Sequence, residues 1–154
     1  MNAVTLEQAD RIVAAALTAG RENGMMPLTV AVLDTGGHPV ALKREDGSGI
    51  LRPQIACGKA WGAIGMGVSS RLLRDRLSDR PTFIAALTAA SDGRFIPVPG
   101  GVLIRDDDGR VIGAVGISGD TSDKDEYCAI EGIKAAGMIP DPAEPDPRWR
   151  ESSL

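Results

Sequence analysis

The stretch Val111-Ile-Gly-Ala-Val-Gly-Ile-Ser-Gly-Asp-Thr-Ser-Asp-Lys-Asp-Glu126 joins an apolar strand, interrupted by two glycines, to polar residues that begin a helix. Gly113 and Gly116 leave room for something to approach the strand backbone closely. Ser122 and Asp125 have the spacing of a capping box, and the free N–H groups of a helix N-terminus favour an anion. We therefore predict a small-ligand site at this strand end, although a core strand followed by a well-capped helix explains the same residues.

The rest of the sequence predicts the other strands and helices. Apolar runs flank the turns at residues 34–38 and 106–109, which predicts two β-hairpins. The predicted helices and strands follow the order α-ββ-ααα-ββ-α, which indicates a largely antiparallel sheet. Because the runs 28–33 and 110–117 lack a clean polar alternation, we expect both to be central strands with helices over both faces. The predicted helices span residues 5–21, 53–64, 69–77, 81–90 and 122–136.

Composition limits the class of protein. With 154 residues and 43% hydrophobic residues, we expect a single domain over residues 1–138. The net charge of −4 and 3% aromatic residues argue against nucleic-acid binding. The sequence has neither a membrane-spanning run nor a signal peptide, which predicts a soluble cytoplasmic protein with no membrane partner. Cys57 and Cys128 lack metal-type spacing and are expected to be small buried residues in a reducing compartment.

Two segments suggest contacts beyond the core. Residues 139–154 belong to a proline-rich tail that is expected to be extended, with Trp149 as a hydrophobic anchor. This tail is predicted either to be disordered or to cross a neighbouring subunit. The arginine cluster between Arg71 and Arg80 is interrupted by acidic residues, which favours a salt-bridged surface or a subunit contact.

Several short motifs follow one another in order along most of the chain: Val30–Asp34 with Gly36-Gly37, Arg44 with Asp46-Gly47, Ala56 with Lys59-Ala60, Gly100-Gly101, and Gly109–Gly119 with Asp125. Together they resemble the GlcG/HbpS-like haem-degrading protein family, which is also found as the C-terminal domain of PduO-type corrinoid adenosyltransferases. The resemblance implies an α/β (α+β) fold, a profilin-like or PAS-like α/β/α sandwich with a five-stranded, largely antiparallel sheet. It also implies homo-oligomers and links to haem binding and degradation, corrinoid binding or small-organic-acid catabolism.

Three cations are expected to face a shared ligand site. Arg44 ends the second predicted strand, Arg52 begins the next helix, and Lys59 lies two turns further along on a face of small residues. An arginine can donate two parallel hydrogen bonds to one carboxylate, so these residues suit a carboxylate ligand. A desolvated lysine has a lowered pKa and can act as a base or an amine nucleophile. The ordinary alternative is a lysine that reaches the rim and pairs with an aspartate.

Glycine-rich backbone is expected opposite these cations. Gly100-Gly101 and Ser118-Gly119 can present N–H groups to an oxyanion, although turn geometry explains the same residues. Asp125 is a candidate proton acceptor, although helix capping explains it as well. Lys59 and Asp125 are thus the predicted catalytic residues. The predicted ligand-binding residues are Arg44, Arg52, Lys59, Gly100, Gly101, Ser118 and Gly119.

Haem is the cofactor that we expect from the resemblance, if the chain has one. His38 is the only histidine of the chain and therefore the predicted iron ligand, although a histidine in a hairpin turn is usually solvated. Tyr127, Cys57 or a threonine are alternatives. Three functions stay open: a tetrapyrrole-binding and haem-degrading protein, a cofactor-independent enzyme or sensor for a small organic acid, and an oligomeric assembly protein.

Overall fold

A five-stranded antiparallel sheet forms the middle layer of the protein, which the computed structural model describes for residues 3–154. The strand order is β2-β1-β4-β3-β5, so β1 and β4 are central, as their continuous apolar sequences predicted. Both predicted hairpins are present, as β1-β2 and β3-β4. The strands are β1 (Thr29–Leu33), β2 (Pro39–Arg44), β3 (Gly101–Arg105), β4 (Val111–Ser118) and β5 (Ile139–Asp141).

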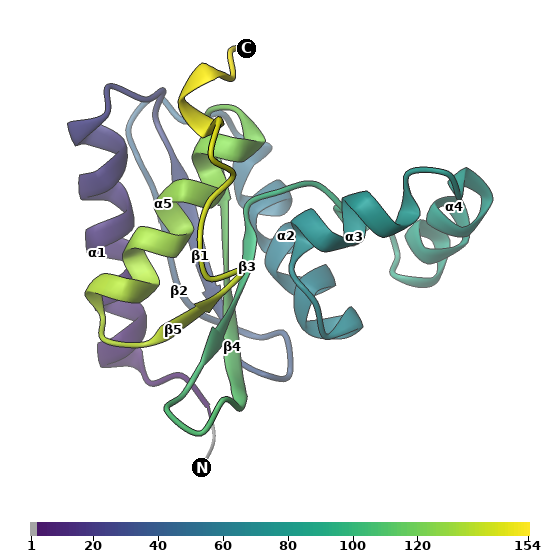
Figure 1. The fold of residues 1–154 in the computed structure, drawn as a ribbon, viewed down its shortest axis with the longest axis horizontal. Coiled ribbons are helices and arrows are strands. Elements are labelled where there is room, and N and C mark those ends of the chain that lie inside the picture. Colours follow the sequence, from purple (N-terminus) through teal and green to yellow (C-terminus); the bar gives the residue numbers. More distant parts are fainter. Residues whose placement is uncertain (1–2) are drawn as a thin grey trace.

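Helices cover both faces of the sheet, which makes the α/β/α sandwich expected from the sequence (Figure 1). Helices α1 and α5 pack on one face and α2 on the other, while α3 and α4 extend away from the body. Within residues 3–154, no helix combines the length and the apolarity needed to cross a membrane. The helices are α1 (Leu6–Glu22), α2 (Arg52–Met66), α3 (Ser70–Leu77), α4 (Pro81–Ala90), α5 (Ser122–Ala135) and the short 3-10 helix η1 (Trp149–Glu151).

Side-chain size differs between the two faces of the central strand β4. Val115 and Ile117 belong to the core beneath α1 and α5, whereas Ala114 belongs to the smaller core beneath α2. A Cβ atom at Gly116 would collide with the carbonyl oxygen of Ala56 on α2. The backbone of α2 therefore rests directly on the sheet, and close approach by this helix explains the glycine without a ligand.

The cap of α1 is confirmed, whereas the cap predicted for α5 is wrong. Thr5 and Gln8 form the expected capping box of α1. In α5 the N-cap is Thr121 rather than Ser122, because Thr121 is extended and its hydroxyl accepts a hydrogen bond from the amide of Lys124. Asp125 does not complete a capping box, since its carboxylate points inward and accepts a hydrogen bond from the Asp120 amide at 3.0 Å.

The proline-rich tail packs on its own chain. Its first residues form β5, which pairs with β3 at the edge of the sheet. Further on, Trp149 is 8% exposed and stacks on Tyr127 of α5, with ring centroids 3.8 Å apart. Trp149 is therefore the hydrophobic anchor that the sequence predicted, and neither disorder nor a neighbouring subunit is needed to place the tail.

Candidate functional site

Lys59 connects the two helical layers of the protein. It extends from α2, and its Nζ donates hydrogen bonds to the carbonyl oxygen of Ile117 at 2.9 Å and to Asp125 Oδ2 of α5 at 3.1 Å. The lysine is 2% exposed. A Cβ atom at Gly100 would lie 2.9 Å from Nζ, so this glycine makes room for the lysine. The structure therefore brings together Lys59, Asp125 and Gly100 as a buried, partnered cluster.

Burial changes the acidity of both members of the ion pair. Desolvation lowers the pKa of Lys59 and raises the pKa of Asp125 to about 6. Each charged group nevertheless has hydrogen-bond partners, which is how a buried ion pair avoids an uncompensated charge. The contacts explain the unusual lysine on a small-residue face by packing and pairing alone. The catalytic roles of Lys59 and Asp125 stay predictions.

The other predicted ligand-binding residues also have partners inside the protein. Arg52 Nη1 donates a hydrogen bond to Ser118 Oγ at 3.0 Å. The amide of Gly101, which was predicted to face an oxyanion, donates to Ser70 Oγ at 2.7 Å. A Cβ atom at Gly119 would collide with the carbonyl oxygen of Pro27, so this glycine serves close packing. The organic-acid hypothesis built on these groups stays a prediction.

Arg44 and His38 lie apart from the Lys59 cluster. Arg44 is on β2, with β1 between it and Ser118, and its exposed guanidinium donates to the carbonyl oxygen of Ser48. His38 lies in the β1-β2 turn, beyond the opposite end of β1 from the residue that pairs with Ser118. Its side chain is 79% exposed, and its Nδ1 is 3.3 Å from Asp34 Oδ1.

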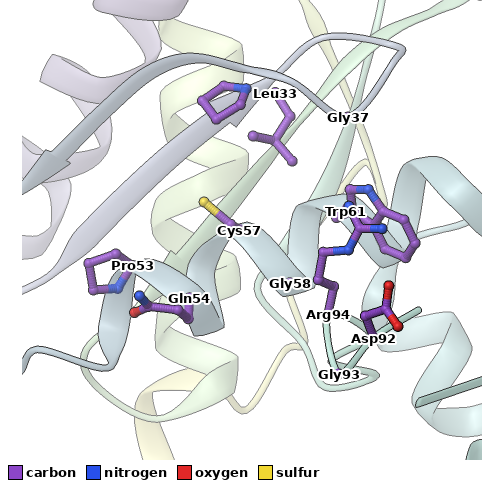
Figure 2. A pocket seen from close by; sticks show the side chains of 11 residues that line it. Leu33, Gly37, Pro53, Gln54, Cys57, Gly58, Trp61, Asp92, Gly93 and Arg94 are labelled. Atoms are coloured by element: carbon purple, nitrogen blue, oxygen red, sulfur yellow. The ribbon is translucent and has the colours of Figure 1, made fainter. Parts of the chain in front are cut away.

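A cavity of about 420 Å³ lies on the other side of α2, beside the β1-β2 turn and the turn at residues 92–94. Figure 2 shows Cys57 on one side of it and Trp61 with Arg94 on the other. Its volume is within the range of small-molecule sites in proteins. The lining residues are Leu33, Gly37, Pro39, Pro53, Gln54, Cys57, Gly58, Trp61, Asp92, Gly93 and Arg94.

Sequence reasoning missed this cavity, although α2 contains a signal for it. Gln54, Cys57, Gly58 and Trp61 follow the i, i+3, i+4, i+7 spacing of one helical stripe, and all four line the cavity. The neighbouring stripe on the same helix includes Lys59 and faces the sheet. The sequence prediction placed the site on this second stripe, and it named Cys57 of the first stripe only as an alternative iron ligand.

The cavity is mainly apolar, with one cation, Arg94, and one carboxylate, Asp92. The Arg94 guanidinium lies over the Trp61 ring, 4.3 Å from its centroid. Burial raises the pKa of the Cys57 thiol, which keeps it neutral and makes it a poor nucleophile. His38 is flanked by two lining residues, Gly37 and Pro39. Among residues 3–154, no three His, Cys, Asp or Glu side chains are grouped to hold a metal ion.

Comparisons with known proteins place the chain in a family. The fold is a five-stranded antiparallel sheet between helical layers, with a cavity beside α2. The family model described as "Haem degrading protein HbpS-like" matches residues 4–134. The protein therefore belongs to the HbpS-like family, which confirms the resemblance seen in the sequence. No curated protein matches the chain.

Solved structures of other proteins resemble this chain over most of its length and theirs. A double mutant of HbpS from Streptomyces reticuli is 27% identical, with a TM-score of 0.73 and coverage of 86% of each chain. The protein ORFY from Klebsiella pneumoniae is 25% identical, with a TM-score of 0.78 and coverage of 87% of this chain and 90% of that chain. PduOC, solved as a haem complex, shares the fold at 24% identity, with a TM-score of 0.79 and coverage of 88% and 96%.

Proposed function

We propose that the protein binds haem or a related tetrapyrrole in the cavity beside Trp61. The observation that carries this proposal is the cavity itself, which combines about 420 Å³ of largely apolar space with a single arginine. A porphyrin needs flat apolar walls for its ring and a cation for its propionates. Gln54 and Arg94 are lining residues that face solvent, and Arg94 would supply the cation for a propionate.

The family supports the same ligand. The description of the HbpS-like family names haem, and PduOC, which shares the fold, was solved with haem bound. Bound haem supplies an iron centre that can bind further ligands. The residues of this chain that line the cavity would hold the porphyrin. Cys57 is one of them, whereas His38 lies between two lining residues with its side chain 79% exposed. The assignment of His38 as the iron ligand stays a prediction.

A haemin titration tests the proposal. We expect a saturable, shifted Soret band, and we expect a bulky side chain at the mouth, introduced as Gln54→Trp, to weaken binding at least 10-fold. Thr18→Trp is the matched control, because Thr18 is exposed on α1 at the opposite face of the sheet. The absence of saturable binding by the natural protein would refute the function, and equal weakening by both tryptophans would refute the location.

Degradation of the bound haem, which the family description names, is the finer proposal. It predicts that the Soret band of the complex decays when oxygen and an external reductant are added, faster than the band of free haemin under the same conditions. A complex that protects haem from this decay would show that the protein binds haem without degrading it.

Self-association is a second candidate function, and helix α4 favours it. The helix reads Pro-Thr-Phe-Ile-Ala-Ala-Leu-Thr-Ala-Ala, has no fully buried residue and projects away from the body (Figure 1). The large apolar side chains of α4 are only partly buried against a small cluster, and half-exposed apolar surface of this kind marks contact sites between proteins; they are Phe83, Ile84 and Leu87. We propose that α4 packs against another copy of the chain. Light scattering should then report an oligomer that Ala86→Glu dissociates, and a monomer in the natural protein would refute the contact.

A further inference from the structure

We infer that Arg94 binds a carboxylate of the ligand, so the cavity selects flat apolar molecules that carry an acid group. The inference rests on the proposed function in one respect, namely that the cavity beside Trp61 is a ligand site. It adds which residue decides the ligand and which chemical group on the ligand that residue recognises.

Arg94 is a cation with unused binding capacity. Its Nε donates to the carbonyl oxygen of Ser91 at 3.1 Å, which leaves the two terminal nitrogens of the guanidinium for another acceptor. Within residues 3–154, no carboxylate lies within ion-pair distance of it. Arg52 and Lys59, by contrast, already bind Ser118 and Asp125. A guanidinium with both terminal nitrogens free fits a carboxylate in the bidentate manner.

The surrounding structure fixes the place of Arg94 before any ligand binds. The Arg94 guanidinium packs on the ring of Trp61. Trp61 in turn packs against the β1-β2 turn, because a Cβ atom at Gly37 would lie 2.7 Å from its ring. A Cβ atom at Gly58 would lie 2.6 Å from the Arg94 carbonyl oxygen, so α2 packs directly on this segment. A cation already held in position loses little conformational entropy on binding, which favours affinity.

The two residues before Arg94 have an uncommon backbone conformation. Asp92 has φ of 53° and Gly93 has φ of 78°, both in the left-handed region. Asp92 is the one non-glycine residue with positive φ among residues 3–154. This turn places the Asp92 carboxylate and the Arg94 guanidinium on the same wall of the cavity, as Figure 2 shows. The Asp92 carboxylate therefore repels an anionic ligand that Arg94 attracts.

The ligand chemistry follows from these walls. Leu33 and Pro53 supply apolar contact surface, and Trp61 adds aromatic surface beside the Arg94 guanidinium that lies over its ring. A planar ring held between them would place an attached acid group at Arg94. Porphyrin propionates have this chemistry, and so do smaller aromatic acids, so the experiment includes both.

The test compares an acid with its ester on two variants. We expect Arg94→Gln to weaken binding of haemin about 10-fold or more, as loss of a charge-assisted contact does, and to leave binding of haemin dimethyl ester unchanged. Asp92→Asn should instead tighten haemin binding, and asparagine tolerates the left-handed conformation, so the turn is kept. Both sites are exposed, and circular dichroism verifies that each variant is folded.

A thiol in the wall reports where the ligand sits. Cys57 lines the cavity and is half-buried, whereas Cys128 is fully buried in the core. Bound haemin, or 2-naphthoate as the smaller acid, should slow alkylation of Cys57 measured by mass spectrometry, and this protection should require Arg94. Cys128 is the internal control, since ligand binding should not change its labelling.

The outcomes separate this inference from the proposed function. Haemin binding that is equally strong in Arg94→Gln, or equally strong for the ester, overturns the role of Arg94 and leaves tetrapyrrole binding intact. Failure of haemin to bind the natural protein, together with Arg94-dependent protection by 2-naphthoate, supports the carboxylate site and refutes the haem function. Absence of any protection by either acid overturns the inference.

Discussion

Replacing Glu126 by glutamine should stabilise the protein above pH 7 and do so much less at pH 5. Glu126 is 0% exposed on α5, and neither carboxylate oxygen accepts a hydrogen bond. Arg71 Nε lies 3.3 Å from Oε2 without forming an aligned hydrogen bond. Burial is the main reason that the pKa of Glu126 rises to about 7, and the Arg71 charge opposes the rise.

The sign and size of the effect follow from this pKa. A carboxyl group whose pKa is higher in the folded than in the unfolded state favours folding while it is protonated. That contribution is complete below pH 4.5 and is lost as the pH rises through 7. The change from 4.5 to about 7 corresponds to about 3 kcal/mol of unfolding free energy at high pH. Glutamine stays neutral, so the variant should keep this stability.

The assay is urea unfolding followed by circular dichroism between pH 5 and pH 9. The difference in unfolding free energy between Glu126→Gln and the natural protein should be about 1 kcal/mol at pH 5 and grow to about 3 kcal/mol at pH 9. Glu22→Gln is the control, because Glu22 is exposed on α1 and its replacement should change stability by less than about 0.5 kcal/mol. A variant that is less stable than the natural protein at pH 9, or whose advantage does not depend on pH, would refute the reasoning.

Three further predictions concern the packing of α2 and the tail. Lys59→Met should lower the free energy of unfolding by about 3 kcal/mol at pH 8 and by less at pH 5, where Asp125 can be protonated. An equal decrease at both pH values, measured by urea unfolding, would contradict the ion pair. Gly116→Ala should lower the free energy of unfolding by about 3 kcal/mol in the same assay, because the added Cβ would meet the α2 backbone. Gly65→Ala should raise it by about 0.5–1 kcal/mol, because no atom lies within 4 Å of the added Cβ. Trp149→Ala should cost about 3 kcal/mol and expose the tail to proteolysis, and an unchanged cleavage pattern would argue against the stack on Tyr127.

The sequence predicted the element order because the signals for it are local. Apolar runs around the turns at residues 34–38 and 106–109 specify hairpins within a few residues, and the structure contains both. The continuous apolar sequence of β4 also predicted its central position, since a strand covered on both faces needs no polar alternation. These predictions need no knowledge of which distant segments meet.

The capping prediction at α5 failed because a distant residue decides it. Ser122 and Asp125 have the spacing of a capping box, and Thr121 is an equally suitable cap one position earlier. Asp125 instead turns inward to Lys59, which is 66 positions away in the chain. Local spacing cannot reveal that partner, and the competing contact removes the side chain from the role that the spacing suggested.

The glycines in β4 were correctly interpreted as sites of close approach, but the approaching groups belong to the protein itself rather than to a ligand: the backbone of α2 at Gly116, and Leu33 of β1 with Val4 at Gly113. Gly116 accommodates the Ala56 carbonyl, and Gly100 and Gly101 accommodate Lys59. A missing side chain looks the same in the sequence whether a helix or a ligand occupies the space. The cavity itself combines residues from three separated segments, 33–39, 53–61 and 92–94, so no single motif specifies it.

Helix α2 resolves this ambiguity, because its two neighbouring stripes serve different purposes. Ala56, Lys59, Ala60 and Ala63 are buried against the sheet, and the stripe that begins at Gln54 and ends at Trp61 lines the cavity. Substitutions on the first stripe should therefore change stability, whereas those on the second should change binding. Arg94 extends the second stripe across to the 92–94 turn through its contact with Trp61. The candidate ligand site is thus the face of α2 that the sheet leaves uncovered, and Lys59 contributes to it by holding the helix in place.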